Sequence, residues 1–564
     1  YPFSLNTERR GAGPVTGDPE MKRFSLLAAL VATALPLAAQ NARVDSVFAQ
    51  YDRKDSPGCA LGVFRNAQIV YSRGYGMANL ELNVPITPEH VFYVGSVSKQ
   101  FTAMSIALLV RDGKLSLDDE VRRHIPELSD FGRPMTIRHL VHHMSGLREK
   151  WDLFQMAGVR DGDVITQHDV VELVRRQREL NFPSGEEHLY NNTAYDLLST
   201  IVTRVSGKSH REFAQERIFG PLGMTHTRYV DDRYLVLPGR ADAYAPRRAG
   251  GWVTANINTV ETTGSGGVHS TIADLQRWDE SFYSHTLGGP QLTALVQTPG
   301  TLNSGEKLSY AFGLTIDEYG GRRRVQHGGA LGGYRAMLMR FPDEHFSVAM
   351  LCNAANANTG LLAERVTDVY LAKPAMVASG DGAAAVPFGE DQPVRYVGAY
   401  LNLQTDELLR VGERAGALTI AGNTPLVHEG SHRFRVNTSG LKLTFDVPHA
   451  GSAQRVRVTR ASGRAVTYER VPALPANVPL GDYAGMYRSN EADAMWRVVV
   501  RDTMLTIFNT PVSAGTELTP VFADAFTTAG WLVRFHREAG GQVDRLTVTT
   551  GRSRRVVFER DRER

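Results

Sequence analysis

The sequence predicts an α+β domain over residues 41–375, followed by an all-β half made of two related small antiparallel barrels. Three observations predict this division. The first part mixes helical and extended patterns, whereas residues 376–393 are rich in glycine, alanine and proline and are typical of a linker. Beyond the linker, short alternating segments are separated by glycine, asparagine or proline, as in all-β domains. This second half also repeats itself.

The first part contains a helix that is expected to be buried. Residues 96–114 are apolar on nearly every face of a helix, which favours a position inside the domain. Residues 58–76 predict two strands around a turn at Arg65-Asn66, because β-branched and aromatic side chains favour extended structure. Further helices are predicted at about 168–180, 193–206, 209–218, 271–284 and 358–372, and strands at about 322–327, 333–341 and 346–352.

The repeat lies in the β-rich half. The Tyr-x-Gly-x-Tyr pattern of residues 396–400 recurs 87 residues later, at 483–487. Two copies of one antiparallel unit explain such a match, and a small closed barrel would leave neither copy with an open sheet edge. Other shared segments are Leu418–Ile420 with Leu505–Ile507, and Tyr468–Arg470 with Phe558–Arg560; the copies are placed at 394–472 and 480–564.

Composition excludes several classes of protein. Apolar residues make up 42% and charged residues 22% of the 564 residues, which is typical of soluble globular chains rather than disordered ones. The net charge of +3 is too small for a nucleic-acid partner to be predicted. The arginine-rich segment 552–564 predicts a final strand and a solvated tail.

The N-terminal region predicts export. Residues 21–39 combine two cations, an apolar run and small residues, which is the layout of a secretory signal peptide. The expected location is therefore secreted or periplasmic, with no membrane role beyond export, because the run is short for a bilayer. An N-terminal anchor is the alternative. Residues 1–20 are interpreted as a non-structural leader, and the oligomeric state is left open.

Ser96 and Lys99 are the first residues that could carry chemistry. Residues three apart share a helix face, so the hydroxyl and the amine can meet. A serine needs a neighbour to take its proton, and a lysine in a dry pocket has a lowered pKa that suits this task. The helix N-terminus adds N–H groups for an oxyanion. An N-cap serine with an exposed lysine is the alternative.

Two further segments carry suitable groups. Tyr190 can share proton transfer with a lysine, and Asn192 can hold a lysine and a substrate amide. The glycines of His327-Gly328-Gly329, after a predicted strand, would let a substrate backbone approach the strand edge. The alternatives are a loop tyrosine, a capping asparagine and a plain turn.

The order Ser-x-x-Lys, Tyr-x-Asn and His-x-Gly resembles the penicillin-recognising serine hydrolases. The Tyr-x-Asn form is similar to the branch that holds class C β-lactamases, D-alanyl-D-alanine carboxypeptidases, D-aminopeptidases and esterases. The resemblance covers about 45–370 and implies a β-lactamase/transpeptidase-like fold: an antiparallel sheet flanked by helices, plus an all-α subdomain. Other matching segments are His143–Leu147, Pro221–Met224, Gly266–Thr271 and Arg340–Asp343.

The resemblance also implies roles. Ser96 would be the acylated nucleophile, Lys99 and Tyr190 the general-base pair, and Asn192 the residue that orients Lys99 and the substrate amide. Residues 327–329 would line the substrate strand. The oxyanion hole would be the N–H groups of Ser96 and Ala330. Class C β-lactamases usually carry lysine where this chain has histidine, whereas D-aminopeptidases and some carboxypeptidases carry histidine.

Two more expectations rest on the resemblance. The paired β units resemble the C-terminal barrels of D-aminopeptidases, in which a barrel loop reaches the active site. Cys59 and Cys352 would lie on antiparallel neighbouring strands, where a disulfide is possible, although the sequence alone favours two buried thiols.

The function expected is a secreted serine hydrolase that uses no metal or other cofactor and acts on a small molecule or short peptide. Amides or peptides with D-residues are preferred, then esters; specificity is expected in loops 148–165 and 228–262. The alternatives are a class C-like β-lactamase, a catalytically silent penicillin-binding or scaffold protein, and a ligand carrier formed by the β half. A zinc site at the closely spaced His139, His142 and His143 is discounted.

Overall fold

The computed structural model describes most of the chain from residue 39 to residue 561. The predicted leader and signal peptide lie outside the described residues apart from residue 39, and so does the predicted linker apart from residues 388, 392 and 393. The described ranges are 39–160, 162–371, 388, 392–420, 424–436, 441–449, 451–460, 465–472, 478–510, 513–528 and 530–561.

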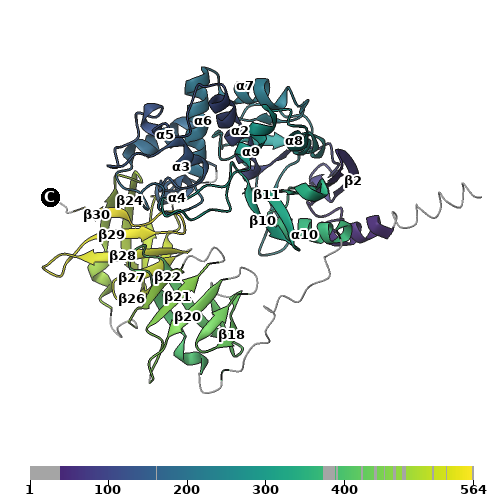
Figure 1. Ribbon diagram of the computed structural model, residues 1–564. Coiled ribbons are helices and arrows are strands. Elements are labelled where there is room, and N and C mark those ends of the chain that lie inside the picture. The colour runs from purple at the N-terminus through teal and green to yellow at the C-terminus, as the bar shows by residue number, and fades with distance from the viewer. Residues whose placement is uncertain are drawn as a thin grey trace, which may run out of the picture.

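A six-stranded antiparallel sheet forms the centre of the first domain (Figure 1). The first and last strands of the domain meet in its middle, so the sheet joins segments almost 300 residues apart. The strand β11 extends to Leu331, so the predicted strand at 322–327 was too short. In spatial order the strands are β10 (Thr315–Tyr319), β11 (Arg322–Leu331), β12 (Tyr334–Phe341), β13 (Phe346–Cys352), β1 (Cys59–Arg65) and β2 (Gln68–Tyr75).

Helices cover both faces of this sheet, as predicted. Alternate residues of β13 show the division: Val348 and Met350 pack in a cluster with the last helix of the domain, whereas Ala349 and Leu351 pack with the larger core. The larger core contains the helix that follows Ser96, which is buried over nearly its whole length. The flanking helices are α2 (Ser98–Arg111), α8 (Ile272–Ser284), α10 (Thr359–Tyr370) and residues 39–47.

The remaining helices form the predicted all-α subdomain. The predicted helix at 209–218 is divided between α7 and a π-helical turn, Gln215–Phe219. Among the described residues, no helix has both the length and the apolar character needed to cross a membrane. The helices are α3 (Ile137–Val141), α4 (Lys150–Met156), α5 (Gln167–Arg176), α6 (Asn192–Ser206), α7 (His210–Ala214) and α9 (Gly289–Val296).

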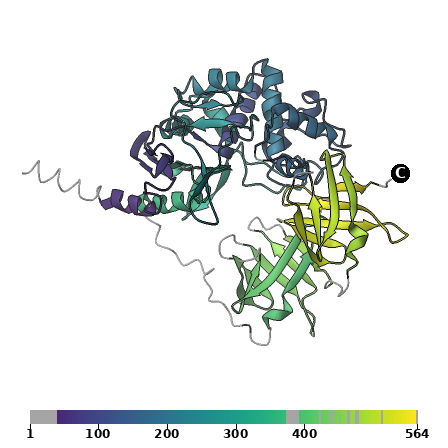
Figure 2. The same ribbon diagram turned by 180° about the vertical axis from the view of Figure 1, so that it is seen from behind.

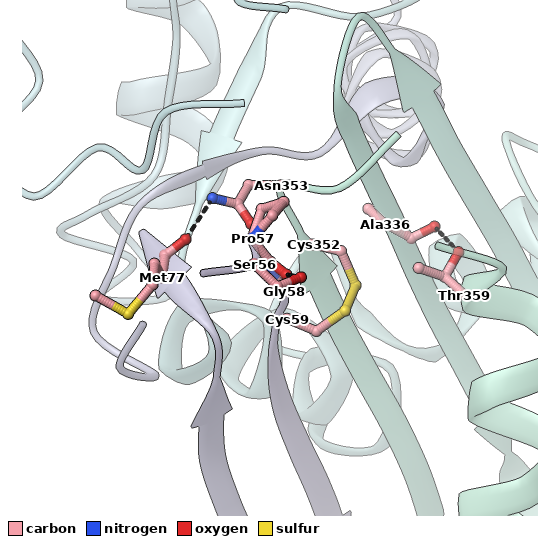
Figure 3. Close-up of a disulfide and its surroundings, with 9 residues drawn as sticks. All are labelled: Ser56, Pro57, Gly58, Cys59, Met77, Ala336, Cys352, Asn353 and Thr359. Carbon is pink, nitrogen blue, oxygen red and sulfur yellow. Dashed lines mark hydrogen bonds between the residues drawn. A yellow bond between two sulfur atoms is a disulfide. The ribbon is translucent and has the colours of Figure 1, made fainter. Parts of the chain in front are cut away.

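A disulfide joins Cys59 to Cys352 (Figure 3). The two residues face each other in the register of β1 and β13, and their Cα atoms are 4.0 Å apart. The expectation of two buried thiols was therefore wrong, because it could not include this register. Next to the bridge, Asn353 accepts a hydrogen bond from Gly58 N at 2.8 Å and donates one to Met77 O at 3.0 Å, which fixes the ends of both strands.

Removing this bridge is expected to cost about 2–5 kcal/mol of unfolding free energy, because the bridge closes a long loop in the unfolded chain. The measurement is chemical denaturation of Cys59→Ala, Cys352→Ala and the double variant. The three should lose nearly the same amount, since each lacks the same bond. Stability equal to that of the wild type in all three would contradict the prediction.

Two antiparallel barrels follow, as predicted (Figure 2). The second is closed by pairing of β23 with β30, whereas in the first β17 and β18 are the two edge strands of a nine-stranded sheet, so its predicted closure is incomplete. The first has β14 (Gly398–Leu401), β15 (Leu408–Arg414), β16 (Ala417–Ile420), β17 (Thr424–Pro425), β18 (Val427–Gly430), β19 (Arg433–Arg435), β20 (Lys442–Asp446), β21 (Arg455–Thr459) and β22 (Ala465–Arg470); the second has β23 (Gly485–Ser489), β24 (Ala494–Arg501), β25 (Met504–Phe508), β26 (Thr516–Phe522), β27 (Ala525–Thr528), β28 (Trp531–Arg537), β29 (Val543–Thr549) and β30 (Val556–Arg560).

The sequence repeat has a structural cause. In the first barrel Tyr400 donates a hydrogen bond to Tyr396 O and pairs across strands with Arg470. In the second, Tyr487 and Arg560 do the same in their copy. The repeated motif therefore holds the first and last strands of each unit together.

The second barrel packs against the helical subdomain, as both views show (Figures 1 and 2). Trp496 of β24 donates to the carbonyl oxygen of Met156 at 2.8 Å, and its ring lies in the same core as the hydrolase-side residues. Arg148, which is 1% exposed, pairs with Glu491 across this interface. Because a buried charge is costly without its partner, this ion pair fixes the position of the barrel.

Candidate active site

Ser96 lies in a 3-10 turn, Gly95–Val97, which leads into α2 and packs against β11. Two glycines allow the close approach. A Cβ atom at Gly95, whose φ is +55°, would lie 2.5 Å from Ala330 N, and one at Gly329 would lie 2.0 Å from Val94 O. The turn therefore brings the backbone N–H groups of Ser96 and Ala330 to the same end of the cleft.

Lys99 lies one helical turn beyond Ser96 and is completely buried. Its Nζ is 3.1 Å from Ser96 Oγ, 2.7 Å from Asn192 Oδ1 and 2.8 Å from the carbonyl oxygen of Ser265. Burial lowers the pKa of Lys99 to about 7, against the opposing effect of nearby acidic groups. A neutral amine has two N–H donors, which Asn192 and Ser265 would accept, so its lone pair would face the serine hydroxyl.

Asn192 is held in place by a residue that sequence reasoning missed. It begins α6, and the helix cap is the preceding Asn191, which accepts a hydrogen bond from Ala194 N. The backbone N and the Nδ2 of Asn192 donate to the two oxygens of buried Glu149, at 2.8 and 3.0 Å. These bonds fix which amide atom faces Lys99. Burial raises the pKa of Glu149.

Tyr190 lies beside the same amine. The Nζ of Lys99 is 4.8 Å from the centre of its ring. Burial raises the pKa of Tyr190, while a hydrogen bond with the Ser96 side chain acts in the opposite direction. The phenol is therefore protonated at neutral pH and can donate or relay a proton next to Ser96.

His327, Gly328 and Gly329 lie inside β11 and line the cleft, because the strand continues past its predicted end at residue 327. The imidazole Nε2 is 3.1 Å from the Tyr310 hydroxyl and Nδ1 is 2.6 Å from Gly328 O, which requires the proton on Nδ1. Burial, together with the charge of Lys99, lowers the pKa of His327 to about 4. This imidazole is therefore neutral.

A buried ion pair holds one of the residues that contact the Lys99 amine. Lys150 Nζ is 2.5 Å from Asp196 Oδ2, and both side chains are fully buried. Asp196 also accepts a hydrogen bond from Ser265 N at 2.8 Å, and the carbonyl of Ser265 contacts Lys99. The pair thus positions one of the acceptors that orient the amine.

The cleft at Ser96 has a volume of about 720 Å³.

No group of three or more potential metal ligands occurs among His, Cys, Asp and Glu in the part of the chain that the structure describes. The discounted histidines have separate partners: His139 accepts from Thr136 N, His142 lies near Tyr310 O, and His143 accepts from Asn191 N.

A loop of the second barrel completes the cleft wall. The turn between β29 and β30 places Arg552 in the lining, with its guanidinium carbon 5.0 Å from the ring centre of Tyr190. This turn agrees with the resemblance to proteins in which a barrel loop reaches the active site. The prediction of a final strand and a solvated tail for residues 552–564 was wrong for Arg552, because local composition does not show long-range docking.

The chain matches known proteins over most of its length. The sequence model of the β-lactamase family matches residues 44–371. A D-aminopeptidase of Brucella ovis is 26% identical over 529 residues, covering 89% of this chain and 96% of the relative. A D-aminopeptidase of Gluconobacter oxydans is 27% identical and covers 78% and 81%. The fold is also similar to an octameric penicillin-binding protein homologue from Pyrococcus abyssi, with a TM-score of 0.54, 21% identity and coverage of 84% and 98%.

Proposed function

Because this chain belongs to the β-lactamase family of serine hydrolases, we propose that it hydrolyses small amides or peptides through an acyl-enzyme on Ser96. The observation that carries the proposal is the contact of Ser96 Oγ with Lys99 Nζ at 3.1 Å. Asn192 and Ser265 accept the other hydrogen bonds of this amine. A weak nucleophile is activated when a neighbouring base is held in this way.

Acylation begins when Lys99 takes the proton of Ser96 as Oγ attacks the substrate carbonyl carbon. The carbonyl oxygen becomes an oxyanion, which the N–H groups of Ser96 and Ala330 stabilise. The carbon–nitrogen bond then breaks. Tyr190 donates its proton to the leaving nitrogen and regains one from the Lys99 ammonium.

Deacylation uses the same groups in reverse. A water molecule attacks the ester carbon and passes a proton through Tyr190 to Lys99. The bond between the carbonyl carbon and Ser96 Oγ breaks, and the serine regains its proton. The product leaves as a carboxylic acid, and the neutral amine is restored.

The substrate class is proposed to be amides or peptides that contain D-residues, with esters next. The support is the family, together with two relatives named D-aminopeptidase that match over most of their length. An exported location belongs to the same proposal. The disulfide supports it, because oxidising compartments favour such bonds.

Covalent labelling tests the acyl-enzyme directly. A fluorescent phosphonate or penicillin should add to the native protein, and mass spectrometry should place the adduct on Ser96. Heat-denatured protein and Ser96→Ala are expected to remain unlabelled, whereas Ser98→Ala should retain the label, because the Ser98 hydroxyl accepts a hydrogen bond from Val268 N at 3.1 Å. No adduct on the native protein would favour a catalytically silent binding protein.

A further inference from the structure

We propose that Arg552, in a cleft whose other arginine is Arg335, binds the carboxylate of a substrate, so that the enzyme selects substrates with an anionic group over those with a free ammonium group. This inference rests on the proposed function and names its substrate class. It depends on the charges that line the cleft, on the way in which Arg552 is held there, and on the absence of competing groups among the lining residues.

The two guanidinium groups are the fixed charges of the cleft lining. Of the described residues that line the cleft, Arg335 and Arg552 are basic and none is aspartate or glutamate. His327 also lines the cleft, but its imidazole is neutral. A free ammonium group in the substrate would therefore have no anionic partner among these residues, whereas a carboxylate could pair with a guanidinium group, which is suited to bidentate binding.

Arg552 is presented by a turn that is fixed on both sides. On the hydrolase side, Asn181 Nδ2 donates to Arg552 O at 2.8 Å and Asn181 Oδ1 accepts from Arg554 N at 2.8 Å. Glu149 N donates to Ser553 Oγ at 3.1 Å. Since Glu149 also holds Asn192, the turn is anchored directly to the group that orients Lys99.

The first barrel fixes the other end of this turn. Arg555 Nε is 3.0 Å from the carboxylate of Asp406, which is 3% exposed and also pairs with Arg534. These contacts hold the backbone of the turn, whereas the Arg552 guanidinium forms no ion pair or side-chain hydrogen bond with another described residue and is exposed to the cleft. The backbone position of Arg552 is therefore fixed, and its guanidinium group can bind a ligand without first breaking an ion pair.

Arg335 lies near the start of β12. It pairs with Ala330 across β11 and β12, next to the proposed oxyanion hole. Its Nη1 donates to Gly332 O at 2.9 Å and Tyr334 O at 2.6 Å, which fixes the side chain. The cleft therefore has one cation beside Tyr190 and another beside Ala330.

Two substrate series test this site. In the first, the leaving side varies: N-acetyl-D-alanyl-D-alanine is compared with its C-terminal amide. In the second, the acyl side varies: the p-nitroanilides of N-succinyl-D-alanine, N-acetyl-D-alanine and D-alanine are compared. We expect the anionic member of at least one series to have a kcat/KM about tenfold to a hundredfold above the neutral member, and the ammonium member to be the poorest.

Variants assign the preference to the turn. Arg552→Gln should reduce the anionic-to-neutral ratio about tenfold or more, Arg552→Lys should restore part of it, and Arg552→Glu should favour the ammonium substrate. Arg501→Gln removes the same charge from an exposed position on β24 outside the cleft and should leave the ratio unchanged. An unchanged ratio in Arg552→Gln, or a wild-type preference for the ammonium substrate, would overturn the proposal.

Binding separates this proposal from the catalytic one. Calorimetry on Ser96→Ala protein should show tighter binding of the acid than of its amide, and the difference should disappear in the Ser96→Ala, Arg552→Gln double variant. Failure of the wild type to hydrolyse a neutral p-nitrophenyl ester would count against the acyl-enzyme, while the calorimetric difference would still decide the carboxylate site. Equal affinities for acid and amide would refute the site.

Discussion

Replacing Ser96 with alanine is expected to lower kcat for amide hydrolysis by about three to six orders of magnitude, because the variant cannot form the covalent intermediate. Lys99→Met should lower kcat by a similar amount, since an unactivated serine is a weak nucleophile. The measurement is steady-state turnover of the p-nitroanilide of N-succinyl-D-alanine with each single variant and with the double variant.

The losses should not add. If the two residues act as one unit, the double variant should be nearly as active as either single variant. Additive losses, or a Lys99→Met enzyme with near wild-type kcat, would show that the lysine only fills space. Circular dichroism checks that each variant remains folded.

The wild-type pH profile examines the same base. Burial lowers the pKa of Lys99 to about 7, and only its neutral form can accept a proton. The value of kcat/KM should therefore be low at pH values below about 7 and should rise as the pH increases through about 7. Tyr190 has a raised pKa and keeps its proton throughout this range, so it should not produce this limb.

Removing Asp196 is expected to destabilise the fold by about 3–5 kcal/mol, because Asp196→Ala leaves the Lys150 ammonium buried without its partner. The aspartate also holds Ser265, so any protein that folds should have lower kcat. Chemical denaturation measures the first effect and turnover the second.

An exposed ion pair provides a matched control for Asp196→Ala. Asp118 pairs with Arg138 at 2.9 Å, and both side chains are at least 41% exposed. Solvent screens such a pair, so Asp118→Ala should not measurably change stability or turnover. Similar losses in the two variants would mean that burial is not the cause.

The sequence predicted the central residues of the site through two kinds of signal. The spacing of Ser96 and Lys99 allowed their contact, and the resemblance to a known family assigned their roles. The strand register that joins Cys59 to Cys352 is a long-range property, and composition favoured free thiols. The repeat predicted two related barrels because each copy must join its own first and last strands.

The supporting residues could not be predicted in this way. Glu149 and Asp196 are ordinary acids in sequence, and their role depends on burial beside Asn192 and Lys150. Arg552 was assigned to a solvated segment because nothing near it in the chain indicates a partner. Its position follows from the packing of a whole barrel against the helical subdomain.

The barrel turn has a consequence for how this enzyme matures. The reactive serine is synthesised hundreds of residues before the arginine turn that lines its pocket, and this turn can reach the pocket only after the second barrel has folded. Contacts so distant in sequence form late, because loop closure is entropically costly. A newly made chain therefore has its nucleophile well before its full pocket, and its selectivity arises only when the final barrel docks.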